Sequence, residues 1–201
     1  MGSRRSSRSG ARAGRPKKAR RAPAARGKKA PARRTSGGAD RGGSALPRTS
    51  RIEMARVADQ LMRAHAGHAW HGPSLDEVLA DVTAQQASAR PMAGAHNIWE
   101  IVHHVSAWED IGRRRLEGED IGNVTSETDW PPVDDSSASA WAQARERLAS
   151  GHRRLQETLA AMKDADLSRK TRKGTSFYVL AHGIIQHGLY HAGQIALLKK
   201  A

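Results

Sequence analysis

The first 45 residues of this 201-residue chain contain no Leu, Ile, Val, Phe, Tyr or Trp, which restricts a folded core to the remainder. A segment without large apolar side chains cannot bury enough surface to offset its ordering entropy, about 1 to 2 kcal/mol per residue. Residues 1–50 also hold 16 Lys or Arg and a single acid, Asp40. We therefore expect a disordered, Lys/Arg-rich tail over residues 1–49 and one folded domain over residues 50–201.

The excess positive charge belongs to this tail. Residues 51–201 hold 18 Lys or Arg against 19 Asp or Glu, whereas the whole chain carries a net charge of +14. Nucleic-acid binding is thus expected only through the tail, and only non-specifically, because no aromatic residue interleaves its basic clusters. The alternatives are a tail that only solubilises the chain and an over-extended start site.

The composition also bears on compartment and membrane. The chain has no cysteine, which excludes disulfides, thiolate ligands and a Cys nucleophile and agrees with a reducing compartment. No apolar run approaches the roughly 18 residues that span a bilayer, and the tail lacks the apolar core of a secretory signal. Myristoylation and transit-peptide readings of the N-terminus are weaker, because the first pattern is permissive and the second needs an amphipathic helix. We expect a cytoplasmic protein with no membrane partner.

Apolar residues recur three or four positions apart in four long segments, the spacing of amphipathic helices. These segments cover about residues 50–65, 98–118, 141–162 and 177–198. No segment shows the alternation of a strand. The pattern predicts an all-α fold, a four-helix bundle.

Two connections in this bundle are long. Ser74–Glu77 and Asn97–Glu100 have the residues of capping boxes, so the first connection should contain a short helix through Val82 and a further turn at residues 83–89. Residues 119–139 are acidic and rich in turn formers, and we expect a loop there.

Ten histidines occur in the chain, and helical position separates them. At about 100° per residue, His187 and His191 lie one turn apart on the buried stripe of the last helix. His104 falls at the edge of the apolar stripe of its helix, whereas His103 points away. Ordinary positions, on the surface or in satisfied core hydrogen bonds, are expected for His65, His68, His96 and His152.

Three core-facing imidazoles favour a metal site. Burying them without partners would cost about 1 to 3 kcal/mol each, which a shared ion largely removes. An HxxxH pair supplies two nitrogens from one helix face, and a third His on a facing helix completes the set. The candidate ligands are His104, His187 and His191.

The stretches NIWEIVHHVSAWED (residues 97–110) and GIIQHGLYHAGQIALLKK (residues 183–200) resemble the DinB/YfiT-like superfamily. The resemblance covers about residues 51–201 and implies a metal-binding four-helix bundle. Members carry one His on the second long helix and an HxxxH pair on the fourth. By position, these ligands fall on His104, His187 and His191.

The resemblance implies a range of functions. Members include metal-dependent hydrolases and transferases that use low-molecular-weight thiols, so we expect a small-molecule substrate and a divalent metal, Zn or Ni by ligand type. Position 188 is Gly, so the Glu of zincin peptidases is missing. A homodimer is expected by analogy alone. The expected pocket residues are Trp70, His71, Trp108 and Tyr190.

Whether the protein is an enzyme stays open at this point. The alternative is a non-enzymatic module in which the metal stabilises the bundle and the basic tail binds nucleic acid. Catalytic residues, substrate and metal identity are not indicated by the sequence.

Overall fold

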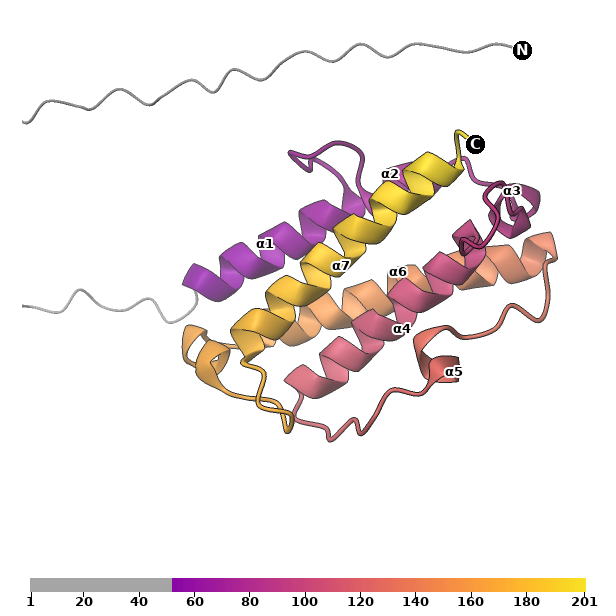
Figure 1. Ribbon diagram of the computed structural model, residues 1–201. Helices are drawn as coiled ribbons and strands as arrows, with labels where there is room; N and C mark the ends of the chain where they lie inside the picture. Colours follow the sequence, from indigo (N-terminus) through magenta and orange to yellow (C-terminus); the bar gives the residue numbers. More distant parts are fainter. Residues whose placement is uncertain (1–51) are drawn as a thin grey trace, which may run out of the picture. The chain divides into compact units, whose positions relative to one another are not determined.

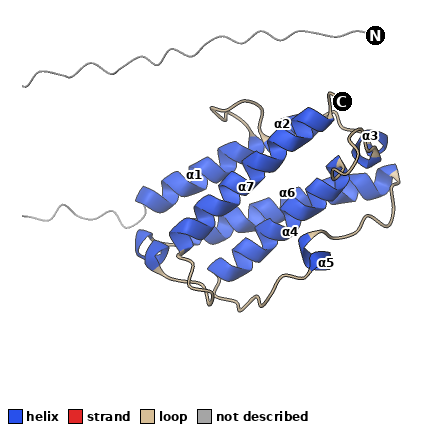
Figure 2. Ribbon diagram, viewed as in Figure 1, coloured by secondary structure: helices blue, strands red, loops and turns tan. Residues whose placement is uncertain are grey.

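The computed structural model describes residues 52–201, which contain helices and no strand (Figures 1 and 2). Four long helices form the body: α1 (Ile52–Ala66), α4 (Ile98–Leu116), α6 (Ala138–Ala161) and α7 (Phe177–Leu198). The connections contain the short helices α2 (Leu75–Leu79), α3 (Ala84–Ser88) and α5 (Ser126–Asp129) and the 3-10 helix η1 (Asp164–Ser168). The predicted all-α bundle is confirmed, and the predicted tail lies outside the described residues.

The long helices pack in a ring. The backbone of α1 lies close to α6 and α7, and that of α4 lies close to the same two helices, whereas the described residues show no such close backbone approach between α1 and α4 or between α6 and α7. α4 and α6 run opposite to α1 and α7 (Figure 1). Consecutive long helices therefore lie across the diagonal, except for α4 and α6. The short helices pack over this bundle, α2 against α1 and α7 and α3 against α4 and α6.

The starts of the helices follow from their caps. The Ser74 side chain accepts from the backbone N–H of Glu77, whose carboxylate accepts from the backbone N–H of Ser74. Asn97 and Glu100 form the same reciprocal pair at the start of α4. Each pair satisfies backbone donors that a helix start leaves free. Both predicted capping boxes are confirmed.

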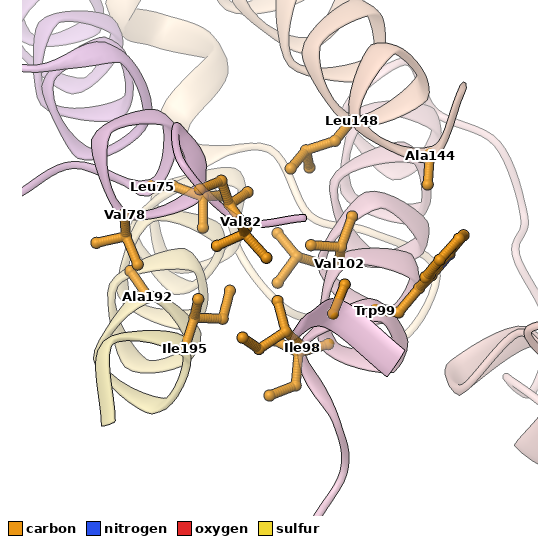
Figure 3. Packing of buried hydrophobic residues seen from close by; sticks show 14 of the residues in the cluster. Leu75, Val78, Val82, Ile98, Trp99, Val102, Ala144, Leu148, Ala192 and Ile195 are labelled. Carbon is orange, nitrogen blue, oxygen red and sulfur yellow. The ribbon is translucent and has the colours of Figure 1, made fainter. Parts of the chain in front are cut away.

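The apolar core consists of two clusters of buried side chains. Figure 3 shows Ile98 and Val102 of α4 lying opposite Ala192 and Ile195 of α7. A second cluster around Phe177 fills the other part of the bundle between α1, α6 and α7. The α4–α7 contact is the one that positions the site below.

The loop expected at residues 119–139 is partly helical. Thr125 caps one turn, α5, by accepting from the backbone N–H of Thr128, and α6 begins at Ala138 rather than Trp141. A single Thr cap is too short a signal to distinguish a one-turn helix from a turn. Between residues 52 and 201 no helix has both the length and the apolar character needed to cross a bilayer.

Candidate metal centre

Three imidazoles converge between α4 and α7. His104 lies on α4, and His187 and His191 lie one turn apart on α7. The His187 Nε2 atom is 3.0 Å from His104 Nε2 and 3.1 Å from His191 Nε2. His104 and His191 are buried, and His187 is half-buried. Packing of α4 on α7 thus brings together the three side chains that the sequence singled out.

Hydrogen bonds fix the tautomers of two of these rings. His104 Nδ1 lies 2.6 Å from the backbone oxygen of Asp129, which can only accept, so this nitrogen carries the proton. His191 Nδ1 lies 2.6 Å from Gln194 Oε1, and Gln194 Nε2 donates to the hydroxyl of Tyr190. In the neutral rings, the Nε2 atoms of His104 and His191 therefore carry no proton, and each presents a lone pair.

These two lone pairs cannot both be satisfied by the third ring. His187 Nε2 has at most one proton, so it donates to one neighbour and meets the lone pair of the other. A cation between the three nitrogens removes this repulsion. Bond lengths of about 2.0 to 2.1 Å, typical of zinc and imidazole, imply nitrogen separations of about 3 Å. The observed spacing fits a divalent metal ion held by His104, His187 and His191.

The electrostatics keep the three rings neutral. Burial, followed by the neighbouring His191 and His104, lowers the pKa of His187 to about 4. Burial also lowers the pKa of His104 and of His191. All three are unprotonated near neutral pH, the form that coordinates a metal.

The segment after α5 covers one side of the cluster. The Trp130 ring stacks on His104, with centroids 3.8 Å apart and planes 9° apart, and it also stacks on His96. Trp108 Nε1 donates to Asp129 Oδ1 over 2.6 Å. Sequence analysis missed Asp129 and Trp130, because a one-turn helix and the loop after it are too short to show a period; the Trp-Pro-Pro run was the one visible signal.

Two cavities open at the cluster. The first, of about 490 Å³, is bounded by His104 and His187 and by the side chains of Trp108, Asp129, Val179, Leu180 and Ile184, among others. The second, of about 430 Å³, lies on the His191 side and includes Trp130, Tyr190 and His96. The cluster thus has access to space on both sides.

The expected pocket residues divide between two places. Trp108 lines the first of these cavities and Tyr190 the second. Trp70 and His71 are exposed and line a separate hollow with Ile185 and others. His103 also lies apart from the cluster, since its Nε2 accepts from Trp99 Nε1.

Two histidines expected in ordinary positions are buried together elsewhere. His65 of α1 and His152 of α6 stack on one another beside Glu109 of α4. Sequence analysis missed this cluster because its members lie on three helices, with no short-range spacing to connect them.

A family model described as the DinB superfamily matches residues 69–195, a range that contains His104, His187 and His191. Comparison with curated proteins and with solved structures gave no significant match.

Proposed function

We propose that this chain, which belongs to the DinB superfamily, is a metal-dependent enzyme that converts a small molecule at the His104, His187 and His191 cluster. One observation carries the proposal: three Nε2 atoms converge, and two of the three rings, His104 and His187, line a cavity of about 490 Å³. A closed structural site would have no such space beside it.

The chain's own residues prepare the site. The Asp129 backbone oxygen and Gln194 hold two of the rings with Nε2 facing inward. Such outer partners fix ring orientation and raise ligand basicity. A divalent ion held by three neutral imidazoles would act as a Lewis acid and would lower the pKa of a water or thiol ligand.

Asp129 is the proposed proton acceptor. Among the described residues that line the first cavity, its side chain is the one carboxylate. Trp108 Nε1 donates to Oδ1 and so holds the group in place. The other oxygen is left to accept a proton from a nucleophile.

The cavity wall indicates the substrate class. Val179, Leu180, Ile184 and Trp108 present apolar surface, while polar groups gather at the His cluster. This arrangement fits a small molecule with an apolar body and one reactive polar group. Two reactions suit it: hydrolysis, and transfer of a low-molecular-weight thiol to an electrophilic carbon.

The test uses the full chain, without a His tag, loaded with Zn²⁺ or Ni²⁺. Hydrolysis of nitrophenyl esters probes the first reaction, and consumption of chlorodinitrobenzene with added thiols probes the second. One activity should fall at least about 100-fold in His187→Ala, as expected for removal of a ligand, and stay near wild type in His103→Ala. Equal rates with and without metal would contradict the proposal, and metal-dependent stability without turnover in either assay would favour the non-enzymatic alternative.

A further inference from the structure

A second cluster of buried side chains lies in the bundle core, away from the three-His cluster. His65 of α1, Glu109 of α4 and His152 of α6 are 5%, 5% and 3% exposed. The two imidazoles stack with centroids 3.6 Å apart. Glu109 Oε1 is 3.2 Å from His152 Nδ1 and 3.9 Å from His65 Nδ1. Three helices therefore direct two nitrogens and a carboxylate to one point.

The Nε2 atom of each ring lies next to a polar side chain outside the cluster. His65 Nε2 lies 3.4 Å from Asp76 Oδ1, and His152 Nε2 lies 3.0 Å from the side-chain amide of Gln156. Each ring thus turns Nδ1 inward, toward Glu109. A ligating histidine in metalloproteins typically donates its other ring N–H to a carboxylate or carbonyl oxygen. Asp76 suits this role for His65, and at His152 the Gln156 amide would have to turn its Oε1 toward Nε2 when Nδ1 binds an ion.

The Gln156 amide nitrogen can only donate, so His152 Nε2 accepts from it, and His152 Nδ1 carries the proton and donates to Glu109 Oε1 over 3.2 Å. Two atoms of the cluster remain without a partner. His65 Nδ1 and Glu109 Oε2 are buried without a hydrogen-bond partner. With the single proton of the neutral His65 ring on Nε2, the nitrogen nearer Asp76, the Nδ1 lone pair faces the Glu109 carboxylate. The His65 Nδ1 lone pair and the Glu109 carboxylate therefore face one another in the core, an arrangement that destabilises the fold unless a cation lies between them.

We propose that His65, Glu109 and His152 form a second divalent-metal site, which joins α1, α4 and α6. Two imidazoles and one carboxylate suit Zn²⁺ and Co²⁺. The adjoining cavity measures about 10 Å³, too small for a substrate, so the ion is structural. Since each lone pair lies in its ring plane, binding draws the two rings out of their parallel stack.

The test separates the two sites. The wild-type full chain, purified without a tag, should contain two divalent ions by elemental analysis, and His187→Ala/His191→Ala should keep one. Because the second site is closed to solvent, a chelator should remove its ion far more slowly than the ion of the three-His cluster. In the double variant, titration with Co²⁺ should give one equivalent with a visible absorption band.

Variants of the second cluster complete the experiment. Glu109→Gln, added to that double variant, should weaken Co²⁺ binding at least about 100-fold, and Gln156→Ala about 10- to 100-fold as the loss of an outer partner. Asp110→Asn, the next residue of α4 and paired with Arg113 on the surface, should leave binding unchanged. His152→Gln replaces Glu109→Gln if circular dichroism shows the latter unfolded.

Two results would overturn the proposal. One is a folded double variant that binds no ion, which would mean that protons or a single water complete the cluster. The other is Co²⁺ affinity that is the same with and without Glu109→Gln. Neither result depends on the three-His cluster or on its activity.

Discussion

At the scale of single residues, the roles of His103 and His104 separate most clearly. The two are neighbours on α4, yet His104 Nε2 meets His187, whereas His103 accepts from Trp99. Alanine at His104, His187 or His191 should therefore lower Zn²⁺ affinity far more than His103→Ala, since each loss leaves only two imidazoles. Equilibrium dialysis with elemental analysis measures this. A larger loss of Zn²⁺ affinity in His103→Ala than in His104→Ala would mean that His103 is the ligand on α4.

The lowered pKa of His187 predicts how stability depends on pH. Its pKa is about 4 in the folded chain against an ordinary value of 6.5, so the unfolded chain takes up the proton first. The contribution of the neutral His187 to the free energy of unfolding is fully present above about pH 6.5 and is lost as the pH falls toward 4. With chelator present, the Tm should fall over this window, and less steeply in His187→Gln. A flat Tm between these pH values would contradict the direction of the shift.

Sequence reasoning reached some of these residues and not others. A helical period of about 100° places His104, His187 and His191 on inward faces, and the structure does bring them together. Trp130 and Asp129 could not be found, because Asp129 ends a one-turn helix and Trp130 follows it, and neither segment is long enough to show a period. His65 and His152 were missed because their meeting depends on how α1 and α6 pack, and packing is absent from local spacing.

At the scale of elements, the segment after α5 acts on the cluster through Trp130. This ring stacks on His104 without being a ligand. Trp130→Ala should therefore lower metal affinity about 10- to 100-fold, the range for outer-shell changes. Trp130→Phe keeps a stacking ring and should retain most of the affinity. Isothermal titration with Zn²⁺ measures both, and an unaltered affinity in Trp130→Ala would show that the stack does not orient the ligand.

The close approach of α4 to α7 depends on Gly112. A Cβ there would lie 2.9 Å from Ile184 Cγ1, inside van der Waals contact. We expect Gly112→Ala to destabilise the chain, since overpacking costs about 1 to 3 kcal/mol and alanine returns about 1 kcal/mol of helix propensity. Urea unfolding measures this change. Gly112→Ala/Ile184→Ala should be less destabilised than the two single changes added together, and strict additivity would contradict the contact.

Element boundaries were predictable where side chains mark them. Ser74 and Asn97 indicate the starts of α2 and α4, because each is followed three residues later by the Glu that completes its capping box. The one-turn α5 carries only Thr125 as a cap, and so was not expected. Capping residues thus predict where a long helix starts better than they predict a short helix within a long connection.

At the scale of the whole molecule, charge divides the chain. Because residues 1–50 hold 16 basic residues and residues 51–201 are close to neutral, the full chain should bind DNA weakly. Affinity should fall by orders of magnitude between about 50 and 200 mM salt, as counterion release requires. A chain starting near Thr49 should not bind detectably and should keep its metal affinity. Fluorescence anisotropy with duplex DNA measures this, and the same salt slope after truncation would reveal a basic face on the bundle.

The ring order of the long helices has a consequence for how the chain folds. Of the three successive pairs of long helices, only α4 and α6 have closely packed backbones, while α1 packs mainly on α6 and α7, which lie far along the chain. Contacts between distant segments require large loops to close, and this closure costs chain entropy before the contacts can stabilise the fold. Folding is therefore expected to be slower than for a bundle of similar length with hairpin connections, because its contact order is higher. The same arrangement ties the first helix to the last, so that neither end of the domain can fray without loosening the other.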